Sequence, residues 1–408
     1  MTVSHALRDA ARPFSPSAVT DLLPPRTRVL ALGEPTHGVE AFLDLRNELF
    51  RHLVAEHGYR SIAVESDCLA ALAVDAYLGG ADGDLDTVVR EGFSHGFGEF
   101  AGNRELVRWM REFNSGVAEP DRLRCYGADG PLEMAAAAPP GPSLVRLHDF
   151  LAAHLPAELL PPRKELTRLH GPDGRWTEPA AALDPHRSVG RTAETGRLRL
   201  LADELTVLLA ANAPGFAGRA DPEECWRAEL DARTATGLLR YHAAMADTGP
   251  DRFNSLMRQR ELMMADNLEA IVRREADRGP TLVFAHNRHL QREAGRLPLG
   301  GRELLWWSAG SLLATRLGDG YAFVATAFGH RGADDHPARD TPEGLLAALP
   351  DPRLAVDPRL LAAATGGRAK PRVPADHTYF GLDPQTLGLL DGVVFVREIP
   401  RQSGPFGG

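Results

Sequence analysis

Short apolar runs that end in polar residues alternate with longer amphipathic stretches over the N-terminal part of the chain. Residues 28–34 (RVLALGE), 60–66 (RSIAVES) and 123–129 (LRCYGAD) have the length and composition of buried β-strands. Between the first two runs, residues 39–58 carry apolar side chains at helical spacing, and Gly58 provides a stop signal. This alternation predicts βα units and therefore parallel strands.

The pattern changes after a proline-rich break at residues 135–143 (AAAAPPGPS). Residues 144–264 show only helical periodicity and loops. Beyond them, strand-like runs return at 281–286 (TLVFAH), 321–328 (YAFVATAF) and 392–398 (GVVFVRE). We therefore predict an α/β domain that is interrupted by a helical insertion.

This division has three segments. Residues 1–135 and 265–408 form the two parts of the α/β domain, and residues 136–264 form the helical insertion, which we expect to cover the ligand cleft as a lid. With 408 residues, 43% of them hydrophobic, the chain can bury a large core, and its length is typical of roughly two to three domains.

Charge and cysteine usage exclude several function classes. A net charge of −9 gives no electrostatic reason to expect nucleic acid or an anionic membrane surface as the main partner, so a small molecule fits better. Cys68, Cys125 and Cys225 are odd in number and widely spaced, so we interpret them as reduced thiols. No segment has the pattern of a signal peptide or the length of a membrane span. These features predict a cytoplasmic protein.

Ionisable residues stand at the C-terminal ends of the predicted strands: Glu34, Glu65, Asp129 and His286. In open α/β sheets, ligands bind in the crevice beyond the carboxyl ends of the strands, so side chains at these positions are expected to converge on one site. For Asp129 taken alone, a helix cap or turn is the simpler interpretation, because aspartate favours both.

The loop GEPTHG (residues 33–38) adds His37 directly before a predicted helix, where the positive end of the helix dipole disfavours the imidazolium. Glu34 is close enough in sequence to hydrogen-bond the ring and select its tautomer. Arg46 shares a helix face with Leu43 and Phe50 and leans toward the same loop, where a cation needs a carboxylate. The alternative is that Arg46 extends to solvent.

Two further motifs carry candidate chemistry. The segment AHNRHL (residues 285–290) places His286 and His289 at a strand end, where they could be metal ligands, acid–base groups or polar loop residues. The segment GFSHG (residues 92–96) matches the nucleophile elbow G-x-S-x-G. That motif requires a strand before it and a helix directly after it. Neither is predicted here, so we do not expect Ser94 to be a nucleophile.

At these residues the chain resembles the erythromycin esterase-like family. The likeness is carried by LGEPTHGVEAFLDLRNELFRHLVAEHGYRSIAVES, RQRELMMADNLEAIV, LVFAHNRHLQR, SAGSLLATRLGDGYAFVATAFG and LLDGVVFVRE. The resemblance implies a three-layer α/β/α fold with a mixed, mainly parallel sheet and an inserted helical lobe. Members hydrolyse the lactone of macrolide antibiotics without a serine nucleophile, with the first histidine acting as general base toward water. This chain departs from the family pattern at Glu261 and in SHGFGEF (residues 94–100), so its substrate is not implied.

The resemblance implies the roles of individual residues. The catalytic residues expected are His37, Glu34, Glu65 and His286. The substrate-binding residues expected are Arg46, His289 and Arg260 on the central helix. Asp129 is added as a further substrate-binding residue from its position at a strand end, not from the resemblance. We expect no metal and no cofactor.

The function predicted is hydrolysis of an ester or lactone in a small natural product, such as a polyketide-like compound, with no nucleic-acid or membrane partner. Three alternatives stay open. A biosynthetic cyclase or addition enzyme would use the same base on a substrate hydroxyl. A metallohydrolase would bind one divalent ion through His37, His286 and a glutamate. A non-catalytic protein on the same fold would only bind the small molecule.

Overall fold

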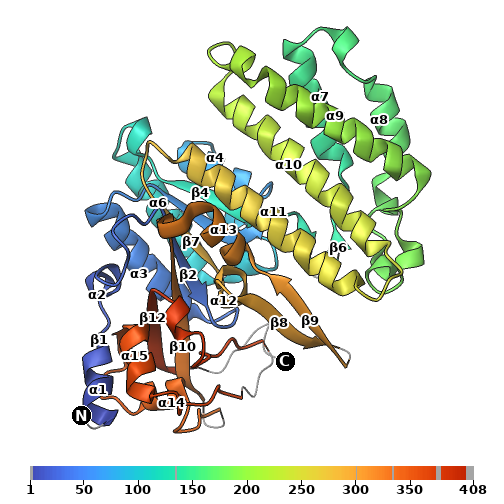
Figure 1. The fold of residues 1–408 in the computed structure, drawn as a ribbon. Helices are drawn as coiled ribbons and strands as arrows, with labels where there is room; N and C mark the ends of the chain where they lie inside the picture. The colour runs from blue at the N-terminus through green and yellow to red at the C-terminus, as the bar shows by residue number, and fades with distance from the viewer. Residues whose placement is uncertain (1–2, 134–135, 300, 333–334, 374–377, 401–408) are drawn as a thin grey trace. The chain divides into compact units, whose positions relative to one another are not determined.

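A mixed sheet of eight strands, in the order β1-β11-β12-β10-β2-β7-β3-β4, forms the centre of the α/β part (Figure 1). The computed structural model describes residues 3–133, 136–299, 301–332, 335–373 and 378–400. The strands of this sheet are β1 (Ala11–Pro13), β2 (Val29–Glu34), β3 (Ser61–Asp67), β4 (Arg124–Asp129), β7 (Thr281–His286), β10 (Tyr321–Arg331), β11 (Arg353–Val356) and β12 (Gly392–Ile399).

The middle of this sheet is parallel and one edge is antiparallel. Strand β2 pairs in parallel with β7 and β10, β7 with β3, and β10 with β12. At one end of the sheet, β11 runs antiparallel to β12 and the edge strand β1 runs antiparallel to β11. The α/β class and the mixed, mainly parallel sheet are therefore confirmed. Strands β1 and β11 were not predicted, because segments of three and four residues are too short to show a strand pattern.

The central strands are buried along their length, as expected of parallel strands, and helix α3 (Glu40–Glu56) packs its apolar face into the same core. Phe42, Leu45 and Leu49 on that helix are at most 1% exposed. Fully burying one such side chain contributes roughly 1.5–3 kcal/mol. Because α3 follows the loop after β2, this packing fixes that loop at the carboxyl edge of the sheet.

The remaining elements of the α/β part are helices and one separate hairpin. The hairpin consists of β8 (Ala294–Leu299) and β9 (Arg302–Trp307) and does not join the central sheet. The helices are α1 (Val3–Ala10), α2 (Pro16–Thr20), α4 (Ala71–Gly79), α5 (Leu85–Gly92), α6 (Ala101–Ser115), α12 (Asn287–Leu290), α13 (Ala309–Leu317), α14 (Pro342–Ala347) and α15 (Pro358–Thr365).

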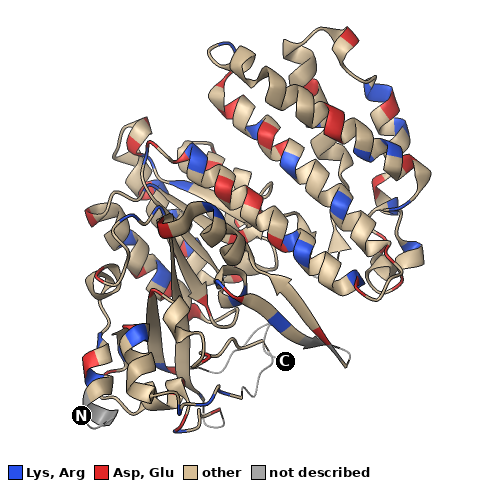
Figure 2. Cartoon of the chain, in the orientation of Figure 1, with Lys and Arg blue, Asp and Glu red and all other residues tan. Residues whose placement is uncertain are grey.

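The helical periodicity predicted for residues 144–264 is confirmed. The helices there are α7 (Gly141–His154), α8 (Arg163–His170), α9 (Ala193–Phe216), α10 (Pro222–Met245) and α11 (Arg252–Arg274). Leucines of α7, α8 and α9 form a separate apolar core with alanines of α10. A two-stranded hairpin, β5 (Leu132–Glu133) and β6 (Ala136–Ala137), lies outside the main sheet. Acidic and basic residues are interspersed along α10 and α11, which is typical of solvated helix surfaces (Figure 2).

The chain divides into two compact units, which are described separately below. The α/β unit contains Met1–Ser66, Ala70–Ala128 and Leu268–Gly408, and the helical unit contains Asp67–Leu69 and Asp129–Asn267. The domain boundaries inferred from the sequence, and the covering of the cleft by the insertion, stay predictions. None of the helices in the described ranges has the length and apolar character needed to cross a bilayer.

Candidate active site

Three of the predicted strand-end residues meet at one edge of the sheet. Glu34 is the last residue of β2 and pairs in register with His286, the last residue of the neighbouring strand β7. Glu65 lies near the end of β3, on the other side of β7. All three are buried, with 4%, 6% and 4% of their surface exposed. Glu34, Glu65 and His286 thus lie together, as expected from the sequence.

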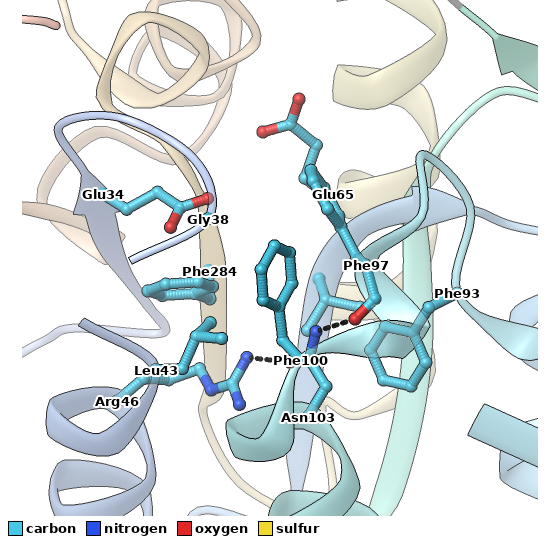
Figure 3. A pocket seen from close by; sticks show the side chains of 11 residues that line it. Glu34, Gly38, Leu43, Arg46, Glu65, Phe93, Phe97, Phe100, Asn103 and Phe284 are labelled. Atoms are coloured by element: carbon cyan, nitrogen blue, oxygen red, sulfur yellow. Dashed lines mark hydrogen bonds between the residues drawn. The ribbon is translucent and has the colours of Figure 1, made fainter. Parts of the chain in front are cut away.

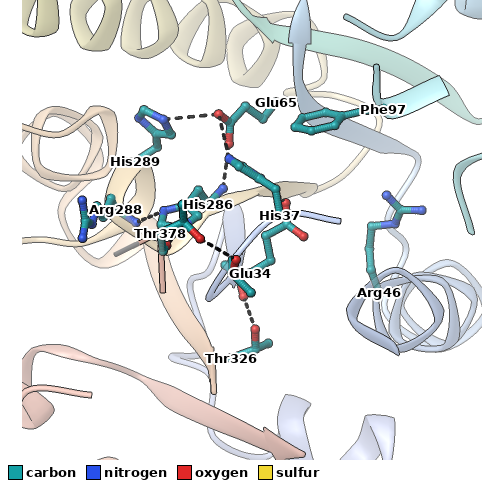
Figure 4. Close-up of polar contacts among 12 residues, drawn as sticks. Glu34, His37, Arg46, Glu65, Phe97, His286, Arg288, His289, Thr326 and Thr378 are labelled. Carbon is teal, nitrogen blue, oxygen red and sulfur yellow. Dashed lines mark hydrogen bonds and ion pairs between the residues drawn. The ribbon is translucent and has the colours of Figure 1, made fainter. Parts of the chain in front are cut away.

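His37 joins the cluster from the loop between β2 and α3. Its Nδ1 lies 2.6 Å from Glu34 Oε1, and its Nε2 lies 3.8 Å from Glu65 Oε1 (Figure 4). Because a carboxylate can only accept, Nδ1 carries the proton in this pair and Nε2 is left as the acceptor. The following residue, Gly38, has a φ of 78°, a left-handed conformation that glycine adopts without strain. The loop therefore presents one defined face of the imidazole.

Two opposing effects act on the pKa of His37. Burial alone would lower it, but the charges of Glu65 and Glu34 outweigh burial, and the net result is a pKa raised from 6.5. The sequence predicted that the helix dipole would keep this ring neutral. The carboxylates act in the opposite direction from much closer range.

Glu65 is the hub of the cluster. Its Oε2 accepts a hydrogen bond of 2.8 Å from the backbone N–H of His286, while Oε1 lies 3.3 Å from His289 Nε2. The same Oε1 faces His37. One buried carboxylate thus contacts all three histidine residues of the cluster, His286 through Oε2 and both His289 and His37 through Oε1.

His286 has both ring nitrogens in hydrogen bonds with the backbone. Nδ1 accepts from the N–H of Arg288 at 3.2 Å, so Nε2 carries the proton and donates to the carbonyl of Thr378 at 3.1 Å. Burial and the adjacent His37, whose ring centre is 4.9 Å away, hold the pKa of His286 well below its ordinary value. This ring is therefore neutral, with its tautomer fixed.

The segment around Thr378 and Phe380 was missed by the sequence analysis. Thr378 Oγ1 lies 3.0 Å from Thr36 Oγ1, and the N–H of Phe380 donates to Pro35 O at 2.7 Å, so this C-terminal segment is tied to the His37 loop. No local pattern could have revealed a contact between residues more than three hundred positions apart. Only the tertiary fold brings these two segments together.

Close backbone approach explains the first glycine of GEPTHG. A Cβ at Gly33 would collide with the side chain of Asn287, which donates a 2.9 Å hydrogen bond to Thr326 O. Thr326 in turn donates to Gly33 O at 2.7 Å. Strands β2, β7 and β10 are therefore locked together just before the catalytic candidates begin.

Arg46 lies on the buried face of α3, so the solvent-exposed alternative is wrong: the residue is 1% exposed. Its guanidinium donates to the side-chain oxygens of Asn47 and Asn103 and to the carbonyl of Gly102, at 2.7–3.1 Å. The predicted carboxylate partner is thus replaced by amide and carbonyl oxygens. Burial lowers the pKa of Arg46 to about 10, against the opposing charge of Glu34. Arg46 and Glu34 line the same small cavity (Figure 3).

The family model described as erythromycin esterase matches residues 54–399. The chain belongs to the erythromycin esterase family. The matched range includes Glu65, His286 and His289, whereas the GEPTHG loop precedes it. No curated protein matches the chain.

Solved structures extend the likeness to the whole fold. A Bacillus cereus protein is 17% identical, with a TM-score of 0.72, and the match covers 98% of this chain and 97% of the other. A succinoglycan biosynthesis protein is also 17% identical, with a TM-score of 0.71 and the same coverage. A mutant of the erythromycin esterase EreC in its open conformation is 18% identical, with a TM-score of 0.66, covering 94% of this chain and 93% of the other. At these identities the likeness concerns the fold.

The other two predicted binding residues of this erythromycin esterase family member belong to the helical unit. Arg260 on α11 donates to Asp129 Oδ2 from Nε at 2.9 Å and from its terminal nitrogen at 2.7 Å. Asp129 is fully buried, and its Oδ1 accepts from the N–H of Gly130. Asp129 therefore accepts a local backbone hydrogen bond, as expected of a cap or turn, and also forms an ion pair with Arg260. A role for this pair in substrate binding stays a prediction.

Ser94 lies in the wrong local context for a nucleophile elbow, as predicted. Helix α5 precedes it, and the single 3-10 turn Phe97–Glu99 follows it. Its N–H and Oγ hydrogen-bond Ser66 Oγ at 2.9 and 3.3 Å. A strand, sharp turn and helix are what the elbow needs. The contacts of Ser94 with Ser66 instead tie its loop to β3.

The described residues also include potential metal ligands. Within the described ranges, no group of three or more His, Cys, Asp and Glu side chains is arranged so that it could hold a metal ion. Cys68 and Cys125 are buried, and burial raises the pKa of each thiol to about 12, so neither is a ready thiolate ligand.

Proposed function

We propose that this protein hydrolyses an ester or lactone bond in a small molecule, with His37 as general base toward water. The observation that carries the proposal is the 2.6 Å contact between His37 Nδ1 and the buried carboxylate of Glu34. This contact leaves the acceptor nitrogen Nε2 facing Glu65 at 3.8 Å. A base so oriented contributes typically about 10²–10⁴-fold to rate.

The sequence of proton transfers follows from this geometry. Water gives its proton to His37 Nε2 as its oxygen attacks the carbonyl carbon, and the bond to the alcohol oxygen then breaks. The imidazolium formed lies between Glu34 and Glu65, which stabilise its charge. The proton finally passes to the leaving alkoxide, so the base is regenerated without a covalent intermediate.

The other residues of the cluster support this step in different ways. His289, held 3.3 Å from Glu65 Oε1, is the candidate for contact with the developing oxyanion. His286 is committed to backbone hydrogen bonds, and Arg46 to amide and carbonyl oxygens. We therefore assign these two residues positioning roles, in place of the catalytic role expected for His286 and the substrate-binding role expected for Arg46.

The proposed substrate class rests on the family and on the net charge of −9, which does not favour a polyanionic substrate. We propose a neutral natural product of the macrolide type, in keeping with the family to which the chain belongs. Erythromycin and simple nitrophenyl esters are suitable first substrates. Incubation in water labelled with heavy oxygen, followed by mass spectrometry, tests the reaction class. Hydrolysis incorporates one labelled oxygen into the acid product, whereas a cyclisation incorporates none.

A further inference from the structure

The ring of Phe97 separates the His37 site from a small internal cavity. Its centre lies 5.1 Å from that of the His37 imidazole, and the same side chain lines the cavity (Figures 3 and 4). His37 itself does not line the cavity. Phe97 therefore forms part of the wall between the proposed base and the cavity, together with Glu34 and Glu65, which contact His37 and also line the cavity.

The cavity behind this wall is mostly apolar. It has room of about 20 Å³, which corresponds to about one water molecule. Its lining is Leu43, Val64, Phe93, Phe97, Phe100 and Phe284, with Gly38, Glu34, Arg46, Glu65 and Asn103. As it stands, the cavity is too small for an organic group. It becomes part of the reaction site only if the Phe97 ring moves or is removed.

The position of Phe97 is fixed by buried polar contacts. Asn103 Nδ2 donates to the Phe97 carbonyl at 2.8 Å, and Asn103 Oδ1 accepts from Arg46 at 2.7 Å. Two consecutive left-handed residues, His95 and Gly96, with φ of 59° and 73°, precede the ring. Within the described chain, His95 is the sole non-glycine residue with such a φ. A strained turn held by buried hydrogen bonds is typical of a functional segment.

We propose that Phe97 determines substrate specificity by limiting the size of the acyl group next to the scissile carbonyl. This inference rests on the proposed function and deepens it. Phe97 closes the His37 site toward the phenylalanine-lined cavity, so the acyl part of a substrate must be short where it extends toward that cavity. Longer linear acyl chains are excluded there by the ring, and removal of the ring joins the space that it fills to the apolar cavity behind it.

The test uses p-nitrophenyl acetate, butyrate, hexanoate and octanoate with the full chain. Phe97→Ala joins the cavity to the site. The ratio of kcat/KM for hexanoate to that for acetate then rises at least about tenfold, as expected when a blocked apolar pocket becomes available. Phe97→Leu gives a smaller rise and serves if the alanine variant does not fold. The melting temperature of each variant is measured in parallel.

Phe93→Ala is the matched control. It enlarges the same cavity but leaves the Phe97 ring in place, so its acyl-length profile stays that of the unaltered protein. The double variant Phe93→Ala/Phe97→Ala shifts the preference further, toward octanoate. A profile that moves equally in Phe93→Ala and Phe97→Ala contradicts the assignment of Phe97 as the wall.

Failure of the inference about Phe97 can be distinguished from failure of the proposed function. If hydrolysis is lost in His37→Gln but the acyl-length profile of folded Phe97→Ala and Phe97→Leu equals that of the unaltered protein, the inference about Phe97 is wrong and the proposed function stands. If the unaltered protein cleaves every ester no faster than His37→Gln, the proposed function is wrong and the inference fails with it.

Discussion

Buried histidines occur in both units, but their partners differ. In the α/β unit, the ring of His37 contacts the carboxylates of Glu34 and Glu65. In the helical unit, the ring of His242 packs against Trp176 with centres 4.9 Å apart and hydrogen-bonds only a backbone carbonyl, that of Ala138. Both rings are shielded from solvent, although the His37 side chain is 27% exposed and His242 is 1% exposed. The second difference is the presence of ionised neighbours around His37.

The consequence appears in the pKa values. Burial lowers the pKa of His242 to about 4 and also lowers that of His170, whose ring stacks on Trp176. The pKa of His37 is raised despite burial, because the nearby carboxylates favour the charged form. Burial alone thus makes a histidine a neutral packing residue. Carboxylates around the ring favour its protonated form instead, which supports a role as general base.

The sharpest test of this contrast is His37→Gln, which has the largest expected effect. We expect kcat to fall by about 10²–10⁴-fold, because the amide cannot take the proton of water. Ligand affinity and melting temperature should change little, since His37 lies in a loop and its removal leaves no core cavity. Single-turnover kinetics on one ester measure the loss of rate, and calorimetry measures ligand affinity and melting temperature.

Ser94→Ala is the control for His37→Gln. It removes a hydroxyl near the site whose contacts are with Ser66, and turnover should stay close to that of the unaltered protein. A folded but inactive Ser94→Ala, or near-normal turnover in His37→Gln, would contradict the general-base mechanism.

Glu65→Gln tests whether the carboxylates set the pKa of the base. The base works in its neutral form, so activity falls as the pH drops through the pKa of His37, which lies above 6.5. Glu65 is the largest of the influences that raise this pKa, so Glu65→Gln should move the acid limb of kcat/KM to lower pH. We also expect a loss of about tenfold or more in kcat at neutral pH, since the imidazolium loses a stabilising charge. An unmoved acid limb would assign the limb to another group.

Part of the candidate site could be predicted from the sequence and part could not. The strand-end residues Glu34, Glu65 and His286 were predictable, because apolar runs mark parallel strands and their carboxyl ends share one edge of the sheet. The partners of Arg46 were not, since nothing local sets how α3 packs on α6. Thr378 was missed for the same reason, and Phe97 was noted only as part of a segment that departs from the family pattern. Their roles come from packing between segments that are distant in sequence or from a turn without regular periodicity.

The stability of the protein at low pH tests the lowered pKa of His242 in the helical unit. The pKa of His242 is lowered in the folded state, so its neutral form stabilises the helical unit above pH 6.5, and that contribution is lost as the pH falls from 6.5 through about 4. The loss is roughly 3 kcal/mol for a shift of this size. Thermal unfolding followed between pH 7 and pH 4 should show this loss. His242→Gln, which cannot titrate, should flatten the pH dependence, and an equally steep curve in that variant would assign the loss elsewhere.

Chelation is the test with the smallest expected effect. We predict that ester hydrolysis survives EDTA, because the ion of the metallohydrolase alternative would need His37, His286 and a glutamate. A catalytic zinc site uses three protein ligands with free lone pairs. Both ring nitrogens of His286 are in hydrogen bonds with the backbone, so neither has a free lone pair for an ion, whereas His37 Nε2 remains an acceptor. Binding an ion through both histidines would break a hydrogen bond of His286. Turnover before and after EDTA treatment, with zinc or manganese then added back, decides between the mechanisms: activity lost to EDTA and restored by either metal would establish the metallohydrolase.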